Sequence, residues 1–187
     1  MVQPTRTRIK ADDYYQLPEY KQHELIQLID GEVIIGMPPI LKHQFIVKKI
    51  LLLLAQVEAQ KGGIAFAAPT EVRFDDDNIF EPDVFYILPA NMSITRQDEK
   101  RIIGAPNLIV EVLSPSTAKF DRQEKYHTYE RHGVDEYWIV DPVHETIEVW
   151  ILNKSGRFQR QGAYGKTDTL QSVTLGTPVE VKTVFDT

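Results

Sequence analysis

The chain has 187 residues, of which 42% are hydrophobic and 26% charged, a composition typical of one globular domain with a sizeable core. It contains no cysteine, which excludes disulfide bonds and thiolate metal sites and leaves oxygen or imidazole ligands for any metal. Its formal net charge of -6 argues against a large basic surface for nonspecific nucleic-acid binding.

No segment has the length and apolar character of a membrane span, because the longest apolar run, residues 50–54, is soon followed by Gln56 and Glu58. The N-terminus carries positive charge without the apolar run of a secretory signal peptide behind it. We therefore expect a soluble, cytoplasmic protein with one domain, residues 1–187. Residues 1–20 are expected to form a peripheral N-terminal segment.

The first predicted elements are a short segment and a hairpin. Residues 14–17 form the short segment, which Pro18 is expected to terminate. Residues 25–36 predict two strands that turn at Asp30-Gly31, since Asp-Gly between apolar runs is a strong hairpin signal.

A long helix is expected after Pro38 and Pro39. Its apolar residues recur at helical spacing: Ile46, Ile50, Leu53, Leu54 and Val57. Gly62 and Gly63 supply the stop.

The middle of the chain predicts strands. Residues 65–67, 71–74 and 83–88 have strand character, with an acidic turn at residues 75–78. Residues 108–113 form a nearly continuous apolar run, which is typical of a central strand.

A second helix is expected to begin at Asp121, where Glu124 completes a capping box, and to end at Gly133. Three further strands are expected at residues 136–140, 146–152 and 179–185, the last at a sheet edge. The predicted fold class is α/β (α+β), with a mixed central β-sheet flanked by helices.

Glu111 is the most informative single residue, because it interrupts the apolar run of residues 108–113. An ionised carboxylate in such a place needs a proton, a salt bridge or a metal. Two interpretations remain open at this point, a salt bridge to an arginine and a metal ligand.

Asp83 begins an apolar strand directly after Pro82, which fixes the backbone before it. Alone it is an ordinary turn residue, and Glu81 is a solvated neighbour or an indirect partner. If the two strands pair, however, Asp83 and Glu111 converge, and two carboxylates with a backbone carbonyl and waters suit Mg²⁺. Lys125, otherwise a solvated helix residue, would then add positive charge near a phosphate or an attacking water.

At this point the sequence resembles the Uma-two family, a branch of the PD-(D/E)XK restriction-endonuclease-like superfamily. The resemblance extends over about residues 25–150. It rests on Glu81-Pro82-Asp83-Val84, residues 108–117, Asp121, Lys125, Tyr129 and residues 133–142, with a looser match at Asp30-Gly31-Glu32 and His43. It implies a restriction-endonuclease-like core, with Asp83 and Glu111 as metal-binding carboxylates and the carbonyl of Val112 as a further ligand.

The chain departs from the superfamily pattern at two places. Leu113 stands where the superfamily has its lysine, so the resemblance makes Lys125, on the following helix, the counterpart. The family's early glutamate aligns with Gln27, and Glu24 lies three residues away. This second departure puts a second metal or an acidic helper in doubt.

The remaining residues of the matching segments have structural interpretations. Asp121 is interpreted as a helix cap that also lies near the site, and His43 as a capping or packing group near a helix start. Tyr129, Tyr137 and Trp138 are expected to pack rather than react.

The expected function is metal-dependent hydrolysis of DNA phosphodiester bonds, with Mg²⁺, or Mn²⁺ in its place, and with a homodimer suggested by the resemblance. Smaller basic patches remain available for phosphates: Arg73, Arg101, Lys119, Arg122 and Arg131. Three alternatives stay open. The first is an inactive nucleic-acid-binding or interaction module that keeps the fold, and Gln27 and the acidic net charge motivate it. The second is a hydrolase of small phosphate esters, and the third is a structural oligomer subunit.

Overall fold

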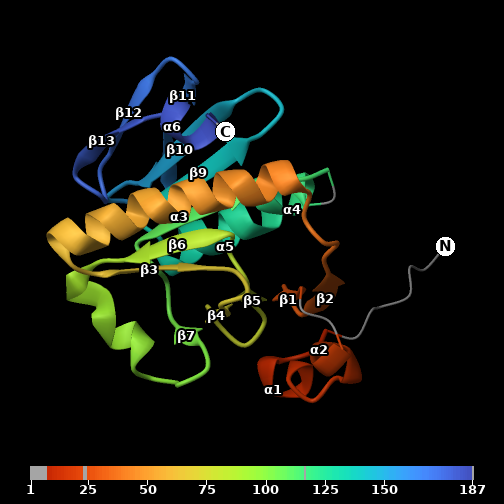
Figure 1. Ribbon diagram of the computed structural model, residues 1–187. Coiled ribbons are helices and arrows are strands. Elements are labelled where there is room, and N and C mark those ends of the chain that lie inside the picture. The colour runs from red at the N-terminus through yellow and green to blue at the C-terminus, as the bar shows by residue number, and fades with distance from the viewer. Residues whose placement is uncertain (1–7, 23–24, 116, 187) are drawn as a thin grey trace.

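The computed structural model describes residues 8–22, 25–115 and 117–186 (Figure 1). Its centre is a six-stranded mixed sheet in the order β11-β10-β9-β8-β6-β3. The strands are β3 (Ile64–Ala67), β6 (Val84–Ile87), β8 (Leu108–Val112), β9 (Glu136–Asp141), β10 (Thr146–Leu152) and β11 (Phe158–Gly165). Mixed sheets flanked by helices confirm the predicted fold class.

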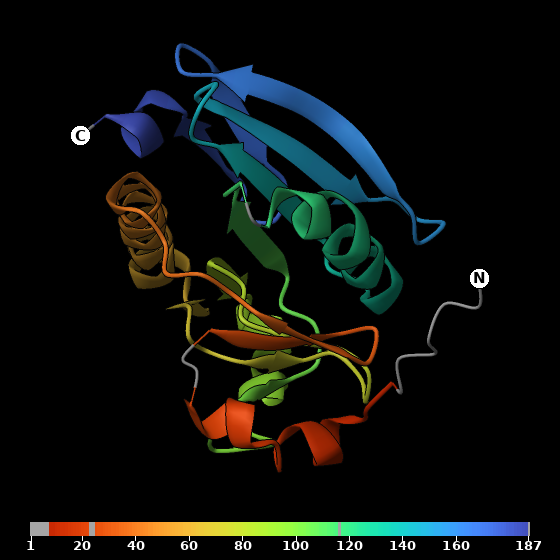
Figure 2. The same cartoon turned by 90° about the vertical axis from the view of Figure 1, so that its right-hand side faces the viewer.

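Strands β8 and β9 are the parallel pair of this sheet, with Glu111 beside Ile139. Parallel neighbours need a crossover connection, and a helical segment supplies it. That segment consists of α4 (Ala118–Phe120), a π-helical turn η2 (Asp121–Lys125) and α5 (Tyr126–His132). It lies on one face of the sheet, while α3 (Leu41–Lys61) covers the opposite face (Figure 2).

Helix α3 confirms the long helix predicted from the apolar spacing. Its buried residues Ile46, Ile50, Leu54 and Val57 form one stripe that packs in the same core as the α3-facing residues of β6, β8 and β9. The helix ends at Gly62, whose φ of 77° is accessible to glycine at little cost.

A second sheet, in the order β2-β1-β5-β4-β7, packs on the side of the main sheet that carries α5. Its strands are β1 (Ile26–Ile29), β2 (Glu32–Ile35), β4 (Val72–Arg73), β5 (Ile79–Phe80) and β7 (Ile102–Ile103), and the 3-10 helix η1 (Pro89–Thr95) precedes β7. The predicted hairpin β1-β2 is confirmed. Both turn residues, Asp30 and Gly31, have positive φ, as the tight hairpin turn requires.

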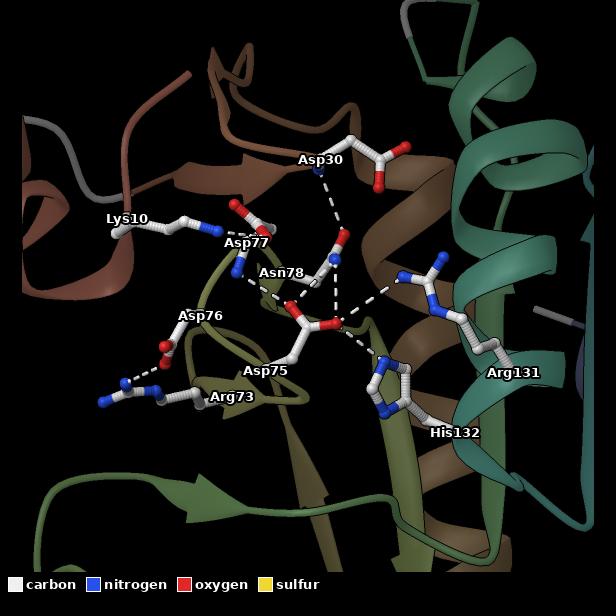
Figure 3. Close-up of polar contacts among 9 residues, drawn as sticks. All are labelled: Lys10, Asp30, Arg73, Asp75, Asp76, Asp77, Asn78, Arg131 and His132. Atoms are coloured by element: carbon white, nitrogen blue, oxygen red, sulfur yellow. Dashed lines mark hydrogen bonds and ion pairs between the residues drawn. The ribbon is translucent and has the colours of Figure 1, made fainter.

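The acidic turn between β4 and β5 braces the second sheet against the end of α5 (Figure 3). One carboxylate oxygen of Asp75 accepts hydrogen bonds from the backbone of Asp77 at 2.8 Å and from Asn78 at 2.9 Å. The other lies 2.8 Å from Nε2 of His132 and 3.6 Å from Arg131. The turn therefore connects the second sheet to the end of α5 through the contacts of Asp75 with His132 and Arg131.

The N-terminal helices α1 (Ala11–Tyr14) and α2 (Pro18–Gln22) pack beneath the second sheet (Figure 1). Tyr14 is fully buried, and its hydroxyl donates a hydrogen bond to the carbonyl of Ile26 at 2.7 Å. Pro18, which was predicted to terminate a segment, begins α2, because proline at a first helical position loses no helical hydrogen bond.

The predicted start of the second helix is wrong. Helical backbone begins at Ala118, and the backbone N–H of Asp121 already donates to the carbonyl of Thr117 at 3.0 Å. Asp121 is 1% exposed and turned toward Lys125, so it is not a helix cap. The predicted end is confirmed, because Gly133 takes the left-handed conformation, with φ 81°.

The C-terminal part differs from prediction in three places. Strands β11 and β12 were not anticipated, and the predicted strand at residues 179–185 is wrong after Glu180. The chain forms β12 (Thr169–Ser172), pairs it with β13 (Thr177–Glu180), and then turns into α6 (Lys182–Phe185). Val184 and Phe185 join the core under α3, and this packing overrides their strand propensity.

Buried Glu136 ties the small β12-β13 sheet to the main sheet. Its carboxylate accepts hydrogen bonds from Trp138 Nε1 at 2.6 Å, Ser172 Oγ at 2.9 Å and the backbone of Thr174 at 2.7 Å. Within the described residues, none of the helices combines the length and the apolar character that a membrane span requires.

Candidate active site

Asp83 lies at the start of β6, where the antiparallel β6-β8 pair places Val84 opposite Val110. The same register brings Asp83 to the level of Glu111 on the neighbouring strand. Its Oδ2 accepts a hydrogen bond from the backbone N–H of Val112 at 2.7 Å. The two carboxylates that the sequence singled out therefore occupy adjacent strands of one sheet.

Glu111 is 2% exposed and points to the face of the sheet that η2 and α5 cover. Its Oε1 accepts hydrogen bonds from Lys125 Nζ at 2.8 Å and from the hydroxyl of Tyr129 at 2.6 Å. Burial raises the pKa of Glu111, and the positive charge of Lys125 opposes that rise. Tyr129 packs as expected, and it also fixes one oxygen of this carboxylate.

Lys125 projects from the π-helical turn into the same place. Its Nζ lies between Glu111 and Asp121, 3.3 Å from Oδ1 of Asp121. Burial lowers the pKa of Lys125, but the two carboxylates outweigh burial and raise it above its ordinary value, so the ammonium stays charged. A π-turn changes the helical phase, and here it directs both Asp121 and Lys125 inward.

His43, in the first turn of α3, contacts Asp83 across the site, although the sequence favoured a capping or packing role. Its Nε2 lies 3.2 Å from Oδ2 of Asp83, and its buried Nδ1 has no hydrogen-bond partner within the part of the chain that the structure describes. Burial lowers the pKa of His43, but the hydrogen bond and charge of Asp83 raise it overall.

A cavity of about 440 Å³ opens onto these residues. Asp83, Glu111, Lys125 and His43 all line it, and so does Gln27. The side-chain oxygen of Gln27 accepts a hydrogen bond from the backbone of Glu81 at 3.2 Å. Asp121 lies behind Lys125, and Glu24, the other candidate for the family's early glutamate, lies outside the described residues.

Glu81 is the lining residue that the sequence interpretation set aside. Burial, followed by the charge of Glu71, raises the pKa of Glu81 to about 8, while Lys125 opposes the rise. Within residues 8–22, 25–115 and 117–186, its buried Oε2 has no hydrogen-bond partner. In the sequence, only its position beside Pro82 and Asp83 indicated that Glu81 could lie near the site. The direction of its side chain depends on how the two sheets pack.

The donor set favours a hard cation. Glu111 and Asp121 flank the ammonium of Lys125, and burial raises the pKa of both carboxyl groups, a rise that a bound cation would oppose. No group of three or more acidic or histidine side chains in the described part of the chain forms a metal-binding cluster. Mg²⁺ commonly binds through one or two carboxylates and keeps several waters. Carboxylate oxygens such as those of Asp83 and Glu111 are donors of the kind that a hard divalent cation accepts.

Comparisons with known proteins agree with this fold. A solved structure, described as "a putative nuclease belonging to DUF820" from Anabaena variabilis ATCC 29413, superposes with a TM-score of 0.74 at 22% sequence identity, covering 95% of this chain and 97% of that one. Among curated proteins, none matches the chain. The Uma2 family, described as "Putative restriction endonuclease", matches residues 11–181. With nearly its whole length matched, this chain belongs to the Uma2 family.

Proposed function

We propose that this protein is a divalent-metal-dependent endonuclease that hydrolyses DNA phosphodiester bonds. The observation that carries the proposal is the convergence of Asp83, Glu111 and Lys125 in one cavity from separate parts of the chain. Two carboxylates beside a lysine form the charge pattern of metal-assisted phosphodiester hydrolysis. The family's description as restriction endonucleases and the similar structure's description as a nuclease support the same reaction.

Asp83, Glu111 and the carbonyl of Val112 would hold Mg²⁺, with Mn²⁺ as a substitute. When bound, such an ion lowers the pKa of a coordinated water and offsets the charge on phosphate oxygens.

The chain's own groups position this reaction. The raised pKa of Lys125 keeps its ammonium charged and able to donate hydrogen bonds to a phosphate oxygen or to an attacking water. Tyr129 holds Glu111 in place through its hydroxyl, and His43 orients Asp83 from α3.

The test is cleavage of supercoiled plasmid with Mg²⁺, Mn²⁺ or a chelator. Asp83→Asn, Glu111→Gln and Lys125→Met are compared with wild type after circular dichroism confirms that each is folded. Lys154→Met is the control, because it removes an exposed lysine from the turn between β10 and β11, outside the residues that line the cavity. We expect metal-dependent nicking that falls about 100-fold or more in the three site variants and not in the control.

A folded wild type that leaves both this plasmid and a single-stranded circular DNA intact with both metals refutes the proposal. DNA binding that persists under those conditions, unchanged by Lys125→Met, would instead identify an inactive binding module, which Gln27 at the position of the family's glutamate favours. Light scattering on the same samples measures whether the protein is the homodimer that the family resemblance suggests.

A further inference from the structure

Exposed apolar side chains form part of the lining of the catalytic cavity. The large hydrophobic residues exposed in the described chain are Ile35, Met37, Ile40, Leu41, Phe45, Leu52, Val143 and Val173. Met37, Ile40 and Val143 line the cavity, and Ile35, Leu41 and Phe45 are sequence neighbours of lining residues. Single exposed apolar residues are ordinary, but a contiguous patch beside a site indicates a binding surface.

One side of this cavity, which we call the apolar wall, consists of Met37, Pro38, Pro39, Ile40, Pro142 and Val143. Proline supplies no N–H, so half of the wall's residues lack the backbone donor that a phosphate would need. The same cavity is lined by the buried Glu111 and Lys125, whereas Met37, Ile40 and Val143 are exposed. The cavity thus combines a buried charged lining with an exposed apolar one, as a nucleotide combines a phosphate with a base.

Two lysines line the cavity, the exposed Lys42 and the buried Lys125, which Glu111 and Asp121 hold in ion pairs. Four of the five basic residues that could have formed patches are paired with carboxylates: Arg73 with Asp76, Arg101 with Glu71, Arg122 with Glu148 and Arg131 with Asp75. Duplex affinity depends chiefly on free Lys and Arg contacts to phosphates. A single strand also needs phosphate contacts, but its unpaired bases add contacts between their faces and the protein that a stacked duplex does not offer.

We propose that the enzyme acts on unpaired nucleic-acid strands, and that a base next to the scissile phosphate rests against the apolar wall. This inference rests on the proposed nuclease function and specifies its substrate class. A volume of about 440 Å³ lies within the range of about 300–1,000 Å³ typical of small-ligand sites, so one splayed nucleotide is an appropriate occupant. A base inside a duplex is stacked and paired, and it reaches such a wall only after it leaves the stack.

The test is equilibrium binding, which needs no turnover. Fluorescence anisotropy in chelator compares a labelled oligothymidine strand with an abasic strand of equal length and with a duplex. The abasic strand keeps every phosphate and lacks the bases. We expect the oligothymidine strand to bind about tenfold more tightly than the abasic strand.

Two serine substitutions form a matched pair. Val143→Ser alters the wall, and Val173→Ser alters an equally apolar turn residue elsewhere, with exposures of 81% and 64%. We expect Met37→Ser with Val143→Ser to remove most of the preference for bases and Val173→Ser to leave it unchanged. Equal affinity of wild type for the oligothymidine and abasic strands overturns the proposal.

Further readouts separate the other outcomes. If light scattering shows that the wall substitutions turn a dimer into a monomer without changing base preference, the patch belongs to a second copy of the chain and the proposal is wrong. Base-dependent binding without metal-dependent cleavage of any strand supports the wall as a binding site while refuting the nuclease function. Metal-dependent cleavage that is as fast on duplex as on single strands supports the nuclease and refutes the substrate class.

Discussion

Removing the ammonium of Lys125 should destabilise the protein, and the loss should grow as the pH rises. In Lys125→Met, Glu111 and Asp121 stay buried, 2% and 1% exposed, without their counter-ion. Breaking a buried ion pair from one side costs about 3–5 kcal/mol. For a chain of this size that corresponds to a fall in Tm of roughly 6–20 °C.

The pH dependence follows from the carboxylates. Burial already raises the pKa of Glu111 and of Asp121, and loss of Lys125 removes the charge that opposes this rise. An acid with a raised folded pKa takes up protons on folding, so its destabilising effect is small below the unfolded pKa and grows as the pH rises through the folded pKa. The variant should therefore lose more stability at pH 8 than at pH 5.

The assay is urea unfolding in chelator at both pH values, with Glu111→Gln and the double variant completing a cycle. We expect Glu111→Gln to recover part of the stability in the Lys125→Met background, because it removes one of the two stranded charges. A Lys125→Met protein as stable as wild type at pH 8, or a double variant no more stable than Lys125→Met, refutes the buried ion pair.

Three other predictions concern the fold. Asp75→Asn should lower stability at pH 6, and the difference from wild type should vanish as the pH falls below 3.8. Burial raises the pKa of Asp75, but hydrogen bonds, including that to His132, outweigh burial and lower it, so the stabilisation is lost when the folded carboxylate is protonated. Urea midpoints at both pH values check this. Glu136→Ala should cost about 3–5 kcal/mol, because it leaves two buried donors, Trp138 and Ser172, and the partly buried N–H of Thr174 without their acceptor. Hydrogen exchange should then show β12 and β13 opening first, and uniform exchange would contradict the role of this carboxylate in holding the small sheet to the main sheet. Leu54→Ala should cost about 2–5 kcal/mol in thermal unfolding, because Leu54 is fully buried. Leu52→Ala on the same helix should cost less than about 1 kcal/mol, because Leu52 is 52% exposed. Equal losses would mean that α3 does not face the core with the side that carries Leu54.

Local patterns predicted the elements whose own residues decide their structure. The stripe from Ile46 to Val57 anticipated α3, Asp30-Gly31 anticipated the β1-β2 turn, and the apolar run around Glu111 anticipated β8. Each is governed by interactions between residues near in sequence or by a clear burial period.

Other elements lacked such a signal. Strands β5 and β7 have two residues each, too few for a period, and exist because they pair within the second sheet. Strand β11 is largely polar and exposed, so pairing with β10 defines it. Residues 179–185 have strand propensity throughout, but packing against α3 turns the second half into α6.

The sequence by itself identified Asp83, Glu111 and Lys125 as a candidate site, because charged residues beside apolar strands need a compensating partner. Tertiary structure alone decided how that need is met. It brings His43 from α3 to Asp83 and turns Glu81 toward the cavity. It also assembles the apolar wall from two loops about a hundred residues apart. These contacts join distant segments through the packing of two sheets and a π-turn, and no local pattern specifies that packing.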